Sequence, residues 1–485
     1  MLEQTLKQKA IRGSIWKFFE LFCSQGINLL VGCILARLLT PTQFGTVALL
    51  YIFTAVTIPL AQGALGSALV QKKDTTELEQ NSAFWFNIGI STFIYIILFS
   101  ISPFVAKYYD IPELSNIMKL FSLSIILLSI CDVPQSILTK KLSFNYLFRV
   151  GLAQTIVHGI VGITMALANF GVWALVISTL AGQFIALILK FYYAKWLPGF
   201  TFSFKSLWPL FQYGWKLTFS GILGQLMLNI RGLVIGKVYS REDLSISSKG
   251  TQIPSFAMNL LNSSITGVSF PVLSHLQDNK PEFISTMRKM IQYSCFVVMP
   301  TMSLMAINAE IIVRIMLGEQ WLAAVPFLQI ACISYALYPF HTINLQAMNA
   351  LGRSDMYLKL QIIKEALNLT ILLFTYKHGI FTMIAAGYLM GPISIFINSY
   401  PNAKLLGYTA IMQIKDVLSI FCSCLFISFL MSFLLKFINN IFAKLLLTII
   451  LFSISYILIM YMSKNHALNF YLSRCKHLLI KFKGQ

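Results

Sequence analysis

Residues 445–462 read LLLTIILFSISYILIMYM, an apolar run without a single charged side chain. A helix of about 20 mostly apolar residues crosses the hydrocarbon core of a bilayer. About fourteen stretches of this kind follow one another along the chain, separated by short polar breaks. Because a helix satisfies its own backbone hydrogen bonds in lipid, we predict an all-α integral membrane protein with about 14 transmembrane helices.

The composition supports a membrane protein and argues against a nucleic-acid-binding protein. Hydrophobic residues make up 57% of the chain, charged residues 11%, and the mean hydropathy is +0.74. The net charge of +20 comes from Lys and Arg residues spread over many short loops. About 26 of the 37 basic residues fall on the side of the N-terminus. The positive-inside rule therefore places both termini in the cytoplasm and predicts no nucleic-acid partner.

The chain also repeats itself with an offset of about 200 residues. Trp16-Lys17 corresponds to Trp215-Lys216, and Ala36-Arg37 corresponds to Gly236-Lys237. An even number of helices separates the two copies, so both halves run the same way through the membrane. We expect helices 1–6 in an N-lobe (1–200), helices 7–12 in a C-lobe (201–410), and helices 13–14 with a basic cytoplasmic tail in 411–485. Parallel repeats of this type build transporters that hold substrate between two lobes.

Arg231 lies near the middle of the seventh predicted span, beside Asn229. An ionisable group at this depth costs several kcal/mol unless it faces water or a partner. Arg231 either forms a structural pair, marks a slightly misplaced span, or lines a hydrated cavity where it binds an anionic group. We interpret it as a cavity residue.

Other polar residues recur near the starts of the two halves and extend this candidate binding surface. Amides at matching positions suit a sugar-binding face or helix–helix hydrogen bonds, and basic residues at span ends either bind anions or reach the interface. The candidate substrate-binding residues are Gln25, Asn28, Arg37, Gln225, Asn229, Arg231, Lys237 and Lys249. Glu20 and Glu365 lie inside predicted spans and are the candidates for ion coupling.

No catalytic motif, cofactor motif or metal-ligand pattern is present in the sequence, so we predict that the protein is not an enzyme. A membrane polymerase or ligase of glycan assembly is the alternative from another class. It would place essential residues in an external loop, and the longest such loop, 308–322, carries Glu310, Arg314 and Glu319.

The start of the chain resembles a known family. The motif Ala36-Arg37-Leu38-Leu39-Thr40-Pro41-x-x-Phe44-Gly45, followed by Gln62-Gly63 and Ala68-Leu69-Val70-Gln71, is similar to the first helices of bacterial polysaccharide exporters. These are lipid-linked oligosaccharide flippases of the Wzx type, near the colanic-acid exporter branch of the multidrug/oligosaccharidyl-lipid/polysaccharide (MOP) superfamily. The resemblance covers the whole chain through its architecture of twelve plus two spans.

The resemblance implies a MATE-like, V-shaped pair of lobes in the bacterial inner membrane. It implies that the substrate is a glycan repeat unit on undecaprenyl diphosphate, flipped from the inner to the outer leaflet by alternating access for O-antigen, capsule or exopolysaccharide synthesis. It further implies membrane lipids as partners, H+ or Na+ as the coupling ion, and polymerase and chain-length regulator proteins as associates. A cation-coupled multidrug antiporter of the same superfamily is the alternative, and such a site would favour a buried carboxylate.

Overall fold

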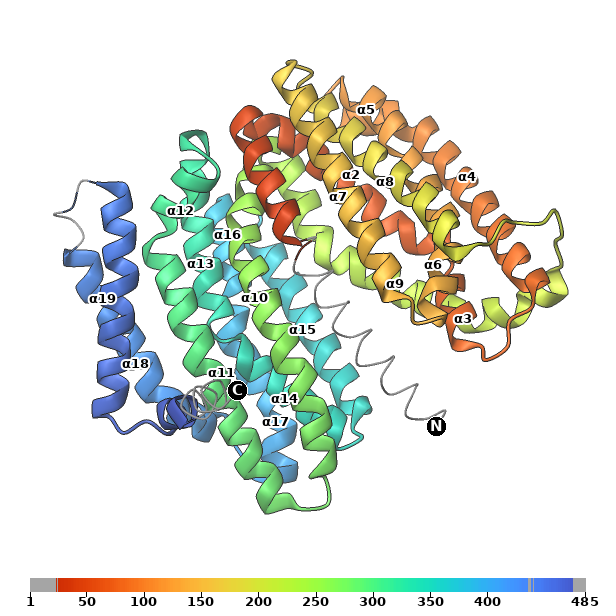
Figure 1. Cartoon of the computed structure of the whole chain (residues 1–485). Helices are drawn as coiled ribbons and strands as arrows, with labels where there is room; N and C mark the ends of the chain where they lie inside the picture. The colour runs from red at the N-terminus through yellow and green to blue at the C-terminus, as the bar shows by residue number, and fades with distance from the viewer. Residues whose placement is uncertain (1–22, 24, 435–437, 439, 474–485) are drawn as a thin grey trace, which may run out of the picture. The chain divides into compact units, whose positions relative to one another are not determined.

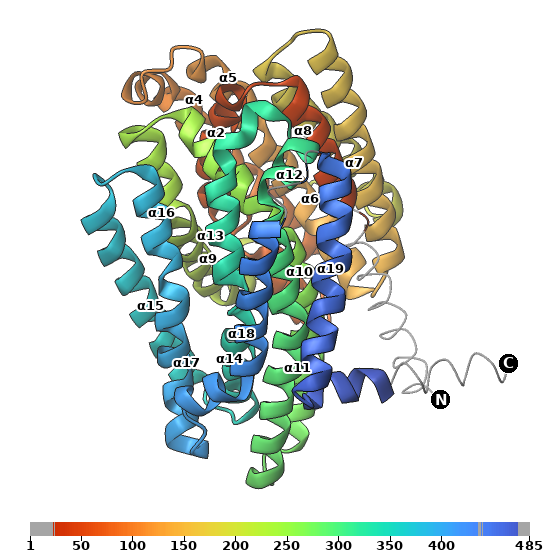
Figure 2. The same cartoon turned by 90° about the vertical axis from the view of Figure 1, so that its left-hand side faces the viewer.

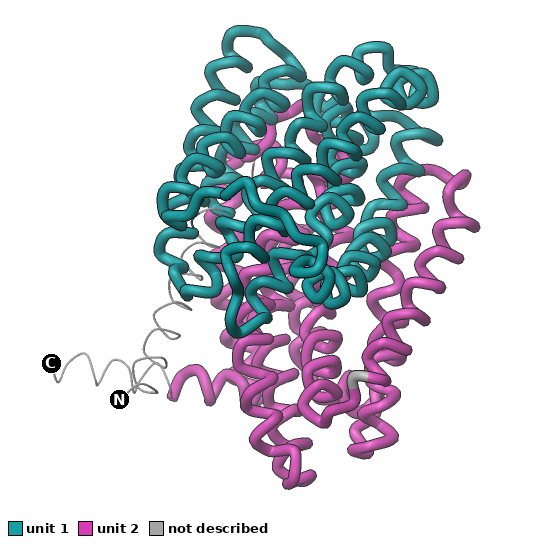
Figure 3. The backbone as a smooth tube through the Cα atoms, turned by 90° about the vertical axis from the view of Figure 1, so that its right-hand side faces the viewer, with its two compact units in different colours: residues 1–245 teal, residues 246–485 magenta. Residues whose placement is uncertain are grey.

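The computed structural model describes residue 23, residues 25–434, residue 438 and residues 440–473. All regular elements in this part of the chain are helical. The chain divides into two compact units, residues 1–245 and residues 246–485, which Figure 3 shows in different colours.

Unit 1 is a bundle of long membrane helices with two short ones at their ends (Figure 1). After a first helix at Gln25–Leu38, its elements are α2 (Pro41–Gln62), α3 (Leu65–Gln71), α4 (Glu77–Tyr108), α5 (Leu114–Phe121), α6 (Leu123–Lys140), α7 (Phe144–Leu167), α8 (Val172–Ala194) and α9 (Phe204–Val238). Helix α10 (Arg241–His275) begins in unit 1 and continues into unit 2.

The sequence fixes the start of α2 through local hydrogen bonds. Thr40 is the N-cap: its hydroxyl accepts from the backbone N–H of Gln43, and the Gln43 side chain accepts from the backbone N–H of Thr40. Pro41 occupies the first helical turn, where its missing N–H costs nothing. The helix ends at Gly63, whose φ of 54° lies in the left-handed region that glycine adopts without strain.

Helix α9 packs against α2 through its glycines. A Cβ on Gly232 would lie 2.7 Å from Ile52 Cδ1, and one on Gly236 would lie 2.5 Å from Leu49 Cδ2. Glycine lets two membrane helices approach closely, and van der Waals packing at that distance drives their association in lipid. The glycine face of α9 is therefore its contact face with α2.

Unit 2 contains the remaining helices, among which α15, α16 and α17 lie side by side (Figure 2). Its elements are α11 (Lys280–Ile307), α12 (Ala309–Met316), the 3-10 helix η1 (Glu319–Ala324), α13 (Val325–Tyr335), α14 (Tyr338–Ala350), α15 (Ser354–Thr375), α16 (Ile380–Tyr388), α17 (Met390–Leu406), α18 (Ala410–Leu434) and α19 (Ile441–Met462). A helical segment at 466–473 follows α19.

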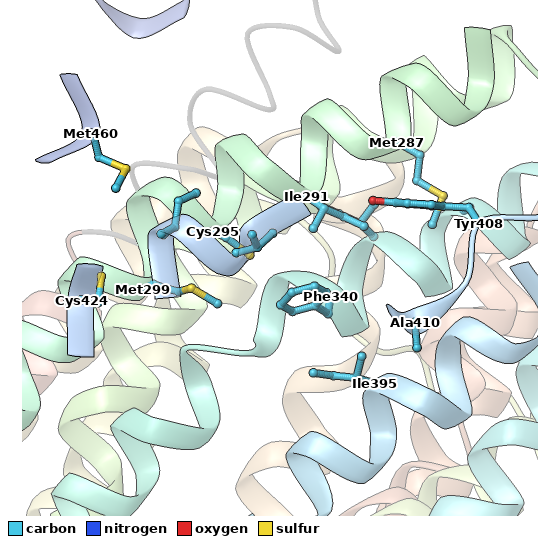
Figure 4. Packing of buried hydrophobic residues seen from close by; sticks show 14 of the residues in the cluster. Met287, Ile291, Cys295, Met299, Phe340, Ile395, Tyr408, Ala410, Cys424 and Met460 are labelled. Atoms are coloured by element: carbon cyan, nitrogen blue, oxygen red, sulfur yellow. The ribbon is translucent and has the colours of Figure 1, made fainter. Parts of the chain in front are cut away.

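The core of unit 2 forms around one face of α11 (Figure 4). Met287, Ile291, Cys295 and Met299 recur at every fourth position, so they share one side of that helix, and all are buried. They pack with Phe340 of α14, Ile395 of α17, Cys424 of α18 and Met460 of α19. One contiguous cluster thus joins these five helices with Leu273 of α10 and Leu468 of the segment 466–473.

The structure confirms the predicted all-helical membrane fold. Eleven helices in the described residues are long and apolar enough to cross a membrane, and each coincides with a predicted span. The first helix and the more polar helices α10 and α15 lie where the sequence predicts the first (about 13–39), eighth (about 244–273) and eleventh (357–376) spans. The expected lobe boundary at residue 200 stays a prediction; by packing, α9 belongs to unit 1. Tail residues 474–485 lie outside the described residues.

The predicted repeat is visible at the starts of α2 and α10. Thr40 accepts from the Gln43 N–H at 3.4 Å, and Ser240 accepts from the Asp243 N–H at 3.0 Å. The same N-cap therefore occurs at the corresponding positions of both halves.

Candidate functional site

Helix α10 has a continuous polar face in a segment of membrane-spanning length. Its packed side is marked by Gly250, where a Cβ would lie 2.6 Å from the carbonyl oxygen of Ala324 and 2.9 Å from Phe327 Cβ. The opposite side carries residues spaced three and four apart, which therefore share one face. These residues are Ser248, Gln252, Ser255, Asn259 and Ser263, and all of them are exposed or half-buried.

The hydroxyls and amides on this face differ in their hydrogen bonding. Ser255 and Ser263 donate to backbone carbonyls of their own helix, at 2.8 Å in both cases. The side-chain amides of Gln252 and Asn259 have no hydrogen-bond partner in the part of the chain that the structure describes. An unpartnered amide in hydrocarbon costs several kcal/mol, so this face requires water or a polar ligand.

The candidate residues of α9 form a local group in unit 1. Asn229 Nδ2 donates to the backbone carbonyl of Gln225 at 2.8 Å and to its Oε1 at 3.3 Å. Gln225 lies two turns before Gly232 and therefore on the side of α9 that faces α2. Arg231 is half-buried and lies to one side of this contact face. The structure thus joins Gln225 and Asn229 to each other.

Lys237 has protein partners at the end of α9. Its ammonium donates to the carbonyl oxygen of Tyr108, lies 4.6 Å from the centroid of the Tyr108 ring and is 3.5 Å from Asp110 Oδ2. These contacts tie the last turn of α9 to the loop after α4. A role for Lys237 in substrate binding stays a prediction, and any such role adds to a structural one.

The other predicted substrate-binding residues are dispersed over several helices. Gln25 is half-buried and Asn28 exposed on the first helix, and Arg37 is exposed at its end. Lys249 is half-buried on α10, next to the polar face. Their participation in a common site stays a prediction.

Of the two predicted coupling residues, only Glu365 lies in the described part of the chain. It is half-buried on α15, where its Oε1 accepts from Gln361 Nε2 at 2.8 Å. Glu20 lies outside the described residues.

Asp132, an acidic side chain well inside α6, is a further candidate residue that was not predicted from the sequence. Its Oδ2 accepts from the backbone N–H of Gly66 and from Asn87 Nδ2, both at 3.0 Å. A Cβ on Gly66 would lie 2.5 Å from Asp132 Oδ1, so only glycine leaves space for this carboxylate. A charged residue inside a predicted span was the available signal, as it was for Arg231.

Polar atoms around Asp132 complete a cluster within unit 1. Asn87 Oδ1 and Ser129 Oγ are buried without a hydrogen-bond partner in the described chain. One turn beyond Asp132 on α6, Gln135 accepts a 2.7 Å hydrogen bond from Lys190 of α8, a lysine that is only 9% exposed. An acid and a base are thus held inside the same helical bundle.

The external loop that would distinguish a polymerase forms a helix closed by ion pairs. Arg314 of α12 contacts Glu310 at 3.0 Å and Glu319 at 3.1 Å. All three charges named in the sequence analysis are therefore engaged with one another. This arrangement stabilises the turn between α12 and η1.

Comparison with known proteins identifies the family. Residues 34–326, more than half of the chain, match the family described as "Polysaccharide biosynthesis protein". The chain belongs to this family. The resemblance to polysaccharide biosynthesis proteins seen in the sequence is therefore confirmed.

Curated relatives are similar to the chain over two thirds or more of their length. The chain is 22% identical to the lipopolysaccharide biosynthesis protein WzxC of Escherichia coli, covering 82% of this chain and 81% of WzxC. It is 24% identical to the teichuronic acid biosynthesis protein TuaB of Bacillus subtilis, covering 73% of each. It is 22% identical to the succinoglycan biosynthesis transport protein ExoT of Rhizobium meliloti, covering 68% of this chain and 67% of ExoT.

Solved structures confirm the fold of this family member. The inward closed conformation of the lipid II flippase MurJ superimposes with a TM-score of 0.71 at 17% identity, covering 93% of this chain and 98% of MurJ. An inward-facing MATE multidrug transporter of the MOP superfamily gives a TM-score of 0.56 at 13% identity, covering 78% of this chain and 96% of the transporter. The predicted MATE-like fold is therefore confirmed, and the chain is a multi-pass membrane protein of the polysaccharide biosynthesis family.

Proposed function

We propose that this exporter moves undecaprenyl-diphosphate-linked oligosaccharide repeat units from the inner to the outer leaflet of the bacterial inner membrane. The product serves O-antigen, capsule or exopolysaccharide assembly. The relatives in lipopolysaccharide, teichuronic acid and succinoglycan synthesis support a glycan substrate. The observation that carries the proposal is the polar face of α10. This face would offer hydrogen-bonding groups to a sugar headgroup across the depth of the membrane.

The chemistry of this face fits a sugar headgroup. Sugar hydroxyls both donate and accept hydrogen bonds, and the amides of Gln252 and Asn259 offer both functions. The prenyl tail of the substrate can stay in lipid while only its headgroup needs a hydrated path. Alternating access would then expose this path to each side of the membrane in turn.

The diphosphate requires a cationic partner. We assign this role to Arg231, with Lys249, Arg37 and Lys237 as further cations along the route. A guanidinium binds phosphate oxygens through paired, charge-assisted hydrogen bonds. Gln25, Asn28, Gln225 and Asn229 would contact the sugars.

The test is complementation of a strain that lacks its own exporter and makes no surface glycan. Arg231→Ala should abolish surface glycan while the variant remains in the membrane. Arg353→Gln is the control, because within the described residues the Arg353 side chain pairs only with the exposed Asp355 at the start of α15. Normal glycan with Arg231→Ala would refute the assigned role of Arg231.

A multidrug antiporter is the second candidate function, and Asp132 is the observation that favours it. A buried carboxylate suits an organic cation, as the sequence analysis noted. The hydrogen bonds to Gly66 and Asn87, however, hold this carboxylate among α3, α4 and α6. Unchanged drug resistance combined with loss of surface glycan in a deletion strain would decide for glycan export.

We further propose that Asp132 takes up and releases the coupling proton. Protonation removes a charge from the membrane interior, and Lys190 is the cationic group near it on α8. Glu365 and Glu20 are the remaining candidates. The polymerase and chain-length regulator proteins stay proposed partners, and the cytoplasmic location of both termini stays a prediction from the distribution of basic residues.

A further inference from the structure

A cavity of about 670 Å³ lies in unit 2 between the first half of α11 and the helical segment 466–473. The lining residues of α11 recur three and four apart, so they form one stripe on that helix. His466, Asn469, Phe470 and Ser473 follow the same spacing on the second helical segment. Two helix faces thus form the walls of this open cavity.

The cavity lies at a membrane boundary, as the sequence on both sides indicates. The polar first turns of α11 precede its apolar part, which begins near Met290, and segment 466–473 follows the end of α19 at Met462. The distribution of basic residues predicts that this boundary is the cytoplasmic one. A ligand here would meet the headgroups of the inner leaflet.

The lining of this cavity is basic, with no acidic residue among its members. Arg288, Lys289 and His466 contribute to it, together with the amides of Gln292 and Asn469. Lys289 and His466 have no hydrogen-bond or ion-pair partner in the described part of the chain. Both are exposed and available to an anion.

The side chain of Arg288 is held in place by Asp416. Its Nε donates to Asp416 Oδ2 at 2.8 Å, and the Tyr408 hydroxyl donates to the same oxygen at 2.7 Å. Burial raises the pKa of Tyr408, so its hydroxyl stays a donor. A guanidinium has five N–H donors, and the carboxylate takes only part of them. Arg288 therefore lines the cavity in a fixed position with donors to spare.

Aromatic contacts fix the second wall of the cavity. The rings of Tyr293 and Phe470 stack with centroids 4.4 Å apart, and the Tyr471 hydroxyl donates to the Tyr293 carbonyl at 3.3 Å. Leu468 is buried in the core cluster of unit 2. Segment 466–473 is thus seated on α11, and the cavity is a built feature of the fold.

We propose that this cavity binds the phosphate headgroup of an anionic phospholipid of the inner leaflet. Lys289 and Arg288 would bind the phosphate oxygens through charge-assisted hydrogen bonds, and His466 and Asn469 would contact the glycerol oxygens. The lipid would join the segment after α19 to α11. This site is separate from the polar face of α10 and does not depend on the transported substrate.

The test measures lipid retained by the purified full-length protein. The protein is exchanged into nanodiscs of phosphatidylcholine with or without phosphatidylglycerol, re-extracted in detergent, and its bound phosphatidylglycerol is counted by mass spectrometry. The double variant Lys289→Gln/His466→Gln should retain about tenfold less phosphatidylglycerol than the wild type. The double variant Lys280→Gln/His275→Gln, which makes the same changes at exposed positions outside the cavity, should behave as the wild type.

Two further measurements complete the test: a variant that adds a negative charge to the cavity, and a competition with a soluble phosphate compound. Ser473→Glu adds a negative charge to the lining and should also expel the lipid. Excess glycerol 3-phosphate should not displace it; displacement would assign the cavity to a soluble phosphate compound and overturn the lipid site. Equal retention by the cavity variants and the wild type would refute the proposal, whatever the result of any transport assay.

Discussion

Ser245 Oγ donates a hydrogen bond of 2.6 Å to the carbonyl oxygen of Pro41, which joins the starts of α10 and α2. The equivalent contact in the opposite direction involves Gly45 and Arg241. A Cβ on Gly45 would be 1.7 Å from the carbonyl oxygen of Arg241. Positions 41 and 45 of the first repeat correspond to 241 and 245 of the second. The two helix starts therefore cross with local two-fold symmetry, and each copy contacts the first-turn carbonyl of the other.

Gly45→Ala should destabilise the protein by about 2–4 kcal/mol, because the added methyl group meets a backbone oxygen that cannot move aside. The measurement is the yield of folded protein and its thermal midpoint in detergent. Gly89→Ala is the control, since a Cβ on Gly89 has no neighbour within 4 Å. Equal stability of the two variants would show that the crossing tolerates a side chain.

Ser245→Ala should cost about 1 kcal/mol, because the buried Pro41 carbonyl loses its side-chain donor. Ser245→Thr keeps the donor and should recover part of this loss. Thermal unfolding in detergent measures both variants. If Ser245→Ala is as stable as the wild type, the Pro41 carbonyl must accept a hydrogen bond from another donor in the variant.

The polar face of α10 should be accessible to water. In a cysteine-free background, Asn259→Cys and Ser248→Cys should react with a membrane-impermeant thiol reagent in intact cells or inverted vesicles. Leu228→Cys on α9 is the control, because its side chain is 78% exposed and apolar, which is typical of a lipid-facing position. Labelling of Leu228→Cys but not of the α10 positions would contradict a hydrated face.

Replacement of Asp132 should make substrate transport independent of the proton gradient. Asp132→Asn keeps the shape of the carboxylate but binds no proton, so substrate flux should lose its dependence on a pH gradient. Flux into proteoliposomes with and without the gradient measures this effect. Wild-type gradient dependence in Asp132→Asn would exclude Asp132 as the proton site and leave Glu365 and Glu20.

Gly66→Ala tests the role of the Asp132 carboxylate without replacing Asp132 itself. Its methyl group would lie within 3 Å of the carboxylate of Asp132 and displace it from Asn87. The gradient dependence of flux should weaken although every titratable residue is retained. An unchanged flux would show that the position of the carboxylate does not matter.

Arg314→Gln should lower stability by less than about 1 kcal/mol, because both of its ion pairs are largely exposed. Surface glycan in a complemented strain should be unchanged. A loss of glycan with intact membrane levels of the variant would indicate an essential role for the loop and favour the enzymatic alternative.

The sequence predicted the helices better than the contacts between them. In the described part of the chain, each of the eleven helices of membrane-spanning length coincides with a predicted span, because bilayer thickness dictates the length of an apolar run. The repeat was visible as residue identities, and Thr40 and Ser240, which stand at corresponding positions, both act as N-caps. Proline and glycine also gave local signals, as at Pro41 and Gly63 in α2.

The side-chain environments could not be read from the sequence. Lys237 looked like an interfacial cation, but its partners at Tyr108 and Asp110 come from a distant loop. The position of Asp132 inside a predicted span was visible, but its donors, Gly66 and Asn87, could not be inferred because they lie on two other helices. A single sequence gives the depth of a residue in the membrane, whereas its neighbours depend on how the helices rotate and pack.

The amides of Gln252 and Asn259, which have no hydrogen-bond partner in the described residues, determine how selective the proposed exporter would be. An amide without a fixed partner can rotate and present either its oxygen or its NH2 group to a hydroxyl. A wall of such groups accommodates galactose as readily as glucose, because strict rejection of an isomer needs rigid, pre-oriented donors. One such exporter can therefore tolerate changes in the repeat unit during the diversification of surface glycans, with fidelity left to the enzymes that assemble the unit.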